Sequence, residues 1–234
     1  TLANGLRVLL VQNDETQKSA AALAVNVGHF SDPNNRQGLA HFLEHMLFLG
    51  TKLYPDGSEY QQFISQYGGS NNAWTATEHT CFFFDIDHQQ FEPALDRFSQ
   101  FFISPLLSAE YVNKERKNID AEFKLKLKDD IRRLYDVHKE TINPAHPFAK
   151  FSVGNTETLA DRPDENLRDT LLDFFNKHYV AGAMTLVVEG PHSLNQLKQW
   201  VTAKFSAIAE AKTITPIDNV PLYLPEHLQI SIQV

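Results

Sequence analysis

The stretch His41-Phe42-Leu43-Glu44-His45 decides how this sequence is interpreted, because it joins a packing surface to a cluster of polar side chains. It lies within residues 38–49, which we expect to form a helix that ends at Gly50. At about 100° per residue from His41, His45 lies at about 40° and Glu44 at about −60°. The apolar side chains lie at about 100° to 240°, and they are Leu39, Phe42, Leu43, Met46 and Leu47. One face of the helix therefore packs, and the other face gathers two imidazoles and a carboxylate.

This polar face has the arrangement of a metal site. Two histidines four positions apart on a helix can direct their ring nitrogens to one ion, and the inverted order of histidines and glutamate is a known zinc-peptidase signature. The same five residues can also arise by chance on a helix. An apolar helix, however, buries two imidazoles and a carboxylate at high cost unless a metal satisfies them. We therefore predict that His41 and His45 bind Zn²⁺ and that Glu44 is the catalytic base.

A third protein ligand is needed, since catalytic zinc usually has three and keeps one position for water. Glu115 and Glu122 are candidates because they lie seven residues apart, within about 20° of the same helix face. Both can also be solvated residues of an exposed, charge-rich helix. The pattern alone leaves these alternatives open.

Working outward from the motif, the remaining chain alternates strand and helix patterns. Strands are expected over residues 5–12, 20–27, 72–77, 80–87 and 184–189, the first two paired with each other and the next two likewise. Helices are expected over residues 38–49, 58–67, 91–102, 109–141, 165–178 and 194–208, the fourth broken or bent near residues 128–131. This order predicts an α+β fold with one sheet covered by helices. We expect one domain over residues 1–212, followed by a linker or the start of a further domain over residues 213–234, where residues 229–234 alternate like a strand.

Composition limits the classes of partner. The net charge of −8 comes without a basic stripe, so nucleic acid is not an expected partner. No apolar run approaches the 18 or so residues of a membrane span. Cys81 is the only cysteine, which excludes an intramolecular disulfide and a cysteine-based zinc site, and its apolar neighbours predict a buried strand position.

Three stretches carry a family resemblance that covers nearly the whole chain, and they are His41-Phe42-Leu43-Glu44-His45-Met46-Leu47-Phe48-Leu49-Gly50-Thr51, Gly68-Gly69-Ser70-Asn71-Asn72-Ala73-Trp74-Thr75 and Asn143-Pro144-Ala145-His146-Pro147-Phe148. Through them the sequence closely resembles the pitrilysin and insulysin family of zinc metallopeptidases. The resemblance implies a mostly antiparallel sheet of the pitrilysin and processing-peptidase type, one Zn²⁺ per chain and peptide endoproteolysis. It also implies Glu122 as third ligand, 77 positions after His45, with Glu115 as an auxiliary catalytic glutamate.

The glycine-led stretch at residues 68–75 has the composition of an edge strand that another backbone can approach. By resemblance, peptide substrates add to this strand through Asn71, Asn72 and Ala73. Trp74 either lines a side-chain pocket or packs in the core, and Tyr135 is a further pocket candidate.

Relatives of the insulysin type are several times longer, so we expect the missing C-terminal domains of a longer chain to be partners. Zinc binding is then expected to persist without them while peptidase activity falls. Two alternatives are a non-catalytic assembly subunit and a small-molecule lyase or hydrolase with the same motif. The chain opens at Thr1 without a leader, so we expect a periplasmic or secreted location if a signal peptide was removed and a cytoplasmic one otherwise.

Overall fold

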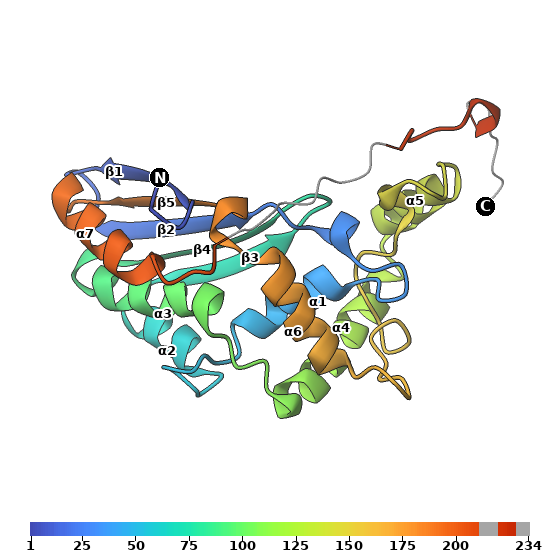
Figure 1. Cartoon of the computed structure of the whole chain (residues 1–234), viewed down its shortest axis with the longest axis horizontal. Helices are drawn as coiled ribbons and strands as arrows, with labels where there is room; N and C mark the ends of the chain where they lie inside the picture. Colours follow the sequence, from blue (N-terminus) through green and yellow to red (C-terminus); the bar gives the residue numbers. More distant parts are fainter. Residues whose placement is uncertain (211–219, 228–234) are drawn as a thin grey trace.

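The part of the chain that the structure describes forms a five-stranded sheet with helices on one face (Figure 1). The structure is a computed structural model that describes residues 1–210 and 220–227. The strands are β1 (Arg7–Gln12), β2 (Lys18–Val25), β3 (Ser70–Thr75), β4 (Thr80–Asp87) and β5 (Met184–Gly190), in the order β1-β5-β2-β4-β3. The pairing of β1 with β5 is parallel and the other three pairings are antiparallel. The α+β prediction with a mostly antiparallel sheet is confirmed.

One predicted pairing is wrong. We expected β1 and β2 to pair with each other, but β5 lies between them, parallel to β1 and antiparallel to β2. Residues 13–17 therefore cross over one strand position instead of closing a hairpin. Strand β5 is aliphatic, with Met184, Leu186 and Val188 fully buried, so the interior of the sheet suits it better than an edge. The predicted pairing of β3 with β4 is confirmed, with Asn72 opposite Phe83.

The helices cover the face of the sheet on which alternate strand residues are buried. On that face Leu23 of β2 and Phe82 of β4 are fully buried, whereas Ala22 and Phe83 on the opposite face remain partly exposed. Figure 1 shows α1, α2, α3, α6 and α7 on this side of the sheet, with α5 set apart from it. The helices are α1 (Leu39–Leu47), α2 (Glu59–Gln66), α3 (Phe91–Ile103), α4 (Ala109–Lys126), α5 (Asp130–Glu140), α6 (Leu167–His178) and α7 (Leu194–Phe205).

Element boundaries differ from the sequence expectations by a few residues. Helix α1 ends at Leu47 rather than 49, because the chain tightens so that the amide of Phe48 donates to the carbonyl of His45. The break or bend predicted near residues 128–131 is a full break between α4 and α5, where the side chain of Asp129 caps the second helix by accepting from the amide of Arg132. The predicted boundary after residue 212 and the predicted strand at residues 229–234 lie outside the described residues.

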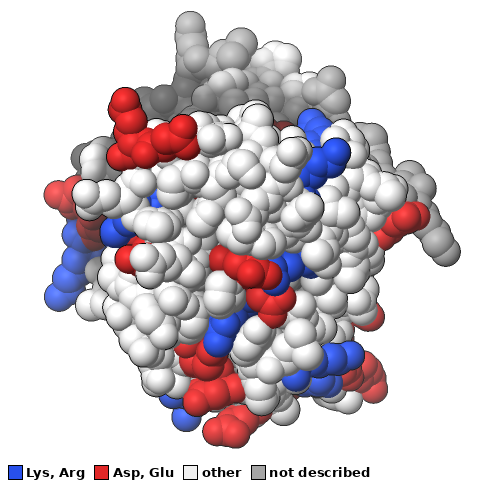
Figure 2. Space-filling view, turned by 90° about the vertical axis from the view of Figure 1, so that its left-hand side faces the viewer, with Lys and Arg blue, Asp and Glu red and all other residues white. Residues whose placement is uncertain are grey.

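On the end of the molecule shown in Figure 2, positive and negative side chains are intermixed. Figure 2 shows the end of the molecule that lies on the left in Figure 1, and on that face Lys and Arg side chains alternate with Asp and Glu over a largely uncharged surface. Among the described residues, no helix combines the length and the apolar character that crossing a bilayer requires. Cys81 is a buried free cysteine of β4, as predicted.

Candidate metal centre

Helix α1 is fixed at its N-terminus by a buried carboxylate. The side chain of Asp32 accepts the amide of Gly38 at 2.7 Å and the amide of Ala40 at 2.8 Å, so it satisfies two of the free donors of the first turn. Gly38 has φ +94, and a Cβ there would lie 2.3 Å from the Cα of Gly154. Only glycine fits this turn, which brings residues 153–154 against the start of α1.

Three side-chain atoms from two helices meet beside α1. The Nε2 atoms of His41 and His45 are 3.2 Å apart, and Oε2 of Glu122 on α4 is 3.7 Å from each of them. Donors bound at 2.0–2.1 Å by a tetrahedral zinc ion stand about 3.4 Å apart. The three atoms lie within 4.8 Å of one another, so two imidazoles and one carboxylate fit a zinc ion with little movement.

Both imidazoles are oriented by a partner on the other ring nitrogen. Nδ1 of His41 is 2.7 Å from the carbonyl oxygen of Val153, and Nδ1 of His45 is 2.8 Å from Oε1 of Glu115. Because both partners are acceptors, Nδ1 of each ring is the donor, and in the neutral ring Nε2 then carries a lone pair that can bind a metal.

The two glutamates of α4 thus have different positions. Glu122 directs Oε2 at both histidines, whereas Glu115 accepts from His45 on one oxygen and from Nδ2 of Asn118 on the other, each at 2.8 Å. The shared helix face predicted from their spacing is present. Of the two glutamates, Glu122 is the one with an oxygen 3.7 Å from both Nε2 atoms.

Burial and neighbouring charges shift the pKa values of the imidazoles in opposite directions. Burial, together with repulsion from His45 when that ring is protonated, lowers the pKa of His41 and favours the neutral imidazole that a metal ligand needs to be. Burial also opposes a charged His45, but the hydrogen bond to Glu115 and the nearby carboxylates outweigh it and raise the pKa of His45.

Glu44 lies next to the three donors without joining them. It is 7% exposed, and its Oε2 accepts a hydrogen bond of 2.5 Å from the hydroxyl of Thr75 on β3. Burial raises the pKa of the Glu44 carboxyl, and the Thr75 hydrogen bond opposes part of this shift. A carboxylate with raised proton affinity beside a metal position is suited to accept a proton from water. Lys126, one turn beyond Glu122, pairs with Oε1 of that glutamate.

A cleft of about 750 Å³ opens from these residues between β3 and α5. Of the residues predicted to bind substrate, Asn72, Ala73, Trp74 and Tyr135 line it, whereas Asn71 lines a separate hollow of about 270 Å³ beside Glu115. Trp74 is 48% exposed, so the core-packing alternative for this side chain is wrong. Strand β3 is at the edge of the sheet, as expected.

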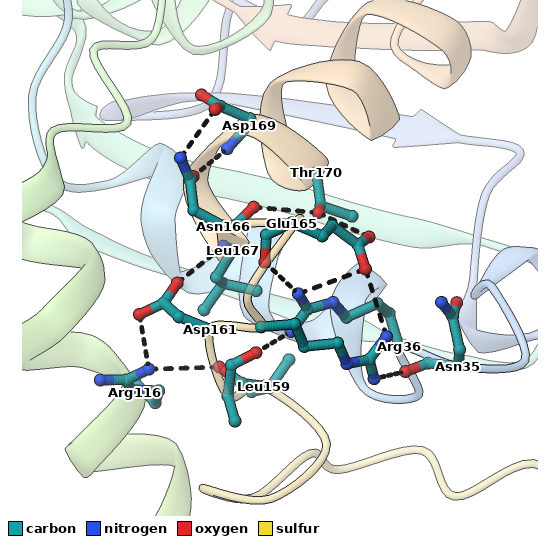
Figure 3. A network of polar contacts seen from close by, with 12 residues as sticks. Asn35, Arg36, Arg116, Leu159, Asp161, Glu165, Asn166, Leu167, Asp169 and Thr170 are labelled. Atoms are coloured by element: carbon teal, nitrogen blue, oxygen red, sulfur yellow. Dashed lines mark hydrogen bonds and ion pairs between the residues drawn. The ribbon is translucent and has the colours of Figure 1, made fainter.

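A polar network holds the segment that supports His41. The buried guanidinium of Arg36 donates to the carbonyls of Ala160 and Glu165, and Asp161 accepts from Arg116 of α4 and from the amide of Leu167 (Figure 3). These contacts attach residues 159–167 both to the chain before α1 and to the helix that carries the glutamates. The network therefore fixes the separation of the two helices that supply the metal donors.

Several residues of this centre were missed by sequence reasoning. Asp32, Thr75, Asn118 and Lys126 contact the site, and Val153 contributes only its carbonyl. A backbone carbonyl leaves no signal in the sequence. Lys126 has one, since it lies four positions after Glu122 on the same helix.

Comparison with known proteins places the chain in a family. The family model for Insulinase (Peptidase family M16) matches residues 7–145, and the one for the Peptidase M16 inactive domain matches residues 166–232. The chain is 45% identical over 230 residues to the insulin-degrading enzyme of Homo sapiens, covering 97% of this chain and 22% of that protein. It is 44% identical over 236 residues to the A-factor-processing enzyme of Saccharomyces cerevisiae, covering 100% of this chain and 23% of that protein.

The fold agrees with a solved structure. The crystal structure of pitrilysin superposes with a TM-score of 0.92 at 37% identity, over 96% of this chain and 24% of that one. The fold is therefore the fold of a class of peptidases. The chain is a member of the insulinase (M16) peptidase family, and it spans about a quarter of the length of these relatives.

Proposed function

We propose that this chain is the metal-binding part of a zinc-dependent endopeptidase that hydrolyses peptides or small unfolded proteins. The observation that carries the proposal is the meeting of Nε2 of His41, Nε2 of His45 and Oε2 of Glu122 beside a cleft along an edge strand. Two imidazoles and a carboxylate are a donor set of catalytic zinc in peptidases. Family membership supports the same reaction class.

Each residue of the centre has a distinct proposed role. His41, His45 and Glu122 hold the ion, which when bound lowers the pKa of water and polarises a carbonyl group. Glu44 takes the proton of the attacking water and returns it to the leaving amine. Its position fits this task because its carboxylate is buried, is oriented by Thr75 and borders the cleft. Glu115 orients His45 and acts through it as a positioning residue.

Substrate is proposed to bind as an added strand along β3. Within the described part of the chain this strand pairs with β4 on one side only, so the amides and carbonyls of its other side are available to an extended peptide. Asn72, Ala73 and Trp74 line the cleft at this edge, Tyr135 faces them from α5, and Asn71 borders the adjoining hollow. Recognition through main-chain groups depends little on substrate sequence, which favours broad specificity.

Full turnover is proposed to need further domains. The two relatives compared above are more than four times as long as this chain, which covers 22% and 23% of their lengths, and the cleft borders the edge strand β3. We expect the isolated chain to bind zinc and to cleave peptides slowly, because water and substrate are poorly confined without other walls.

The test measures zinc content and cleavage of a quenched fluorescent peptide for the parent chain, Glu44→Gln and Glu110→Gln. Glu110 is an exposed glutamate in the first turn of α4 and is the matched control. We expect all three to bind equal zinc, the control to cleave like the parent, and Glu44→Gln to lose at least about a hundredfold in rate. Bound zinc without any turnover in the parent chain would contradict peptidase activity and favour a non-catalytic binding subunit.

A further inference from the structure

Beyond the proposed metal centre and its neighbours, the cleft contains one charged side chain that has no partner among the described residues. Among the described residues that line it, the charged groups are Glu44, Glu122, Lys126 and Arg132, apart from histidines. Lys126 is paired with Glu122. Within residues 1–210 and 220–227, the guanidinium of Arg132 has neither a hydrogen bond nor an ion pair, and the contact between Arg132 and Asp129 is made by the main-chain amide of Arg132.

The location of Arg132 on its helix opposes a purely structural role. It is in the first turn of α5, where Asp129 is the N-cap, and a cation at this end is unfavourable to the helix dipole. Its neighbour Arg133 offsets the same disadvantage by pairing with Asp130 at 3.4 Å. Arg132 has no such carboxylate, although the N-terminus of α5 and the guanidinium together attract an anion.

The surroundings of Arg132 have the features of a side-chain pocket. Tyr135 and Ile131 lie beside it on the cleft wall formed by α5, and Trp74 lies on the opposite wall formed by β3. Ile131 is 74% exposed and Trp74 is 48% exposed, so both present apolar surface to whatever enters the cleft. An apolar pocket with a single arginine fits the methylene groups and the carboxylate of an acidic side chain.

We propose that Arg132 is a specificity-determining residue that makes the cleft prefer extended peptides with a glutamate or aspartate side chain at one position near the scissile bond. The proposal rests on the proposed function, because it names the substrate class of the same cleft. A peptide held along β3 lies between that strand and α5, and because its side chains alternate between the two faces of the sheet, those on the face toward α5 meet Arg132. The partial exposure of the pocket limits the preference to about threefold to tenfold.

The test uses zinc-loaded protein with Glu44→Gln, which holds peptide without turnover, and measures binding by fluorescence anisotropy. The probes are labelled, amidated peptides in pairs that differ only by glutamate or glutamine, with the changed position moved along the peptide. We expect one position at which the glutamate peptide binds threefold to tenfold more tightly. Adding Arg132→Gln should abolish that difference, and Arg132→Glu should reverse it in favour of a lysine peptide.

Arg133→Gln is the matched control, because Arg133 is the next residue on α5, has the same charge and does not line the cleft. It should keep the full preference. The proposal is overturned if no peptide binds, if no position shows a preference, or if Arg132→Gln leaves the preference unchanged. It is also overturned if Arg133→Gln removes the preference equally, since general charge would then be the cause.

Cleavage of the same peptides by protein with intact Glu44 separates this proposal from the proposed function. Cleavage without any charge preference overturns the role of Arg132 alone. An Arg132-dependent binding preference without cleavage supports the specificity pocket and contradicts the peptidase reaction.

Discussion

Replacing Glu115 by glutamine tests how the metal centre is divided between α1 and α4. Glu115 is 9% exposed, and its two oxygens accept from Nδ1 of His45 and from Nδ2 of Asn118, each at 2.8 Å. Glutamine keeps one acceptor for His45 but directs an NH₂ group toward the NH₂ group of Asn118. The substitution therefore removes the charge on the His45 hydrogen bond and leaves a donor facing a donor.

The magnitude follows from the indirect position of Glu115. A carboxylate that orients a ligand histidine typically contributes 10-fold to 100-fold to metal affinity, which is about 1.4 to 2.8 kcal/mol. Glu122→Gln removes the negative charge of the carboxylate whose Oε2 lies 3.7 Å from both imidazole nitrogens, and it should weaken zinc binding much more. We expect Glu115→Gln to raise the zinc Kd by about 10-fold to 100-fold and Glu122→Gln to raise it beyond that range.

The assay is competition for zinc with a chromophoric chelator at pH 7, with Glu110→Gln as the exposed control on the same helix. Circular dichroism of each metal-free variant checks that the fold is kept. If Glu115→Gln and Glu122→Gln weaken zinc binding equally, Glu115 is a direct ligand and the assignment of roles on α4 is wrong. If Glu115→Gln binds zinc like the parent, the hydrogen bond to His45 has no orienting effect.

Four further outcomes are expected. Gly38→Ala should lower the free energy of unfolding in urea by more than about 3 kcal/mol, because its Cβ would lie 2.3 Å from a backbone atom. The control Gly68→Ala, which also has a positive φ (+68) but has open space around it, should cost about 1 kcal/mol; equal costs would contradict the close approach at Gly38. Arg36→Met should cost about 3 kcal/mol in the same assay, because buried carbonyls lose their donor; an unchanged midpoint would contradict the network. Lys126→Gln should tighten zinc binding about threefold in the chelator assay, because the ammonium no longer competes for Glu122; weaker binding would show that Lys126 orients its partner instead. Burial, with smaller effects of two lysines, lowers the pKa of His29 from 6.5 to about 4. The neutral His29 side chain therefore makes its full contribution to stability above pH 6.5, and about 2 kcal/mol of that contribution is lost at pH 5 as the pH falls toward 4. His29→Asn should reduce this pH dependence of stability in thermal melts.

The fold was predictable where the signal is local. The helix through His41 and the strand from residue 80 have clear periods, and both are present within two residues of the expected limits. The strand order was not predictable in the same way. Insertion of β5 between β1 and β2 joins Leu9 to Val187 and Ala22 to the same residue, across most of the chain. Periodicity identifies a strand and its buried face but does not identify its neighbours.

The metal centre shows the same division between local and tertiary information. Helical spacing brings His41 and His45 together before any tertiary contact forms, and it places Glu115 and Glu122 on a common face. Which of the two glutamates lies beside the histidines depends on the offset of α4 relative to α1 along the helix axes. That offset is set by packing, and the sequence pattern of either helix contains no measure of it.

The hydrogen-bond acceptors of the two histidines connect the position of α4 to that of α1. His41 is oriented by the carbonyl of Val153, and His45 by Glu115 of α4, so the two rings have separate supports from different parts of the chain. Residues 153–167 connect these supports, because they contact the turn at Gly38 and are attached to α4 through Arg116. A shift of this segment therefore moves the acceptor of His41 relative to the acceptor of His45. On the proposed function, a zinc ion would need both Nε2 lone pairs directed to one point, and this requires α1, α4 and this segment to keep their relative positions.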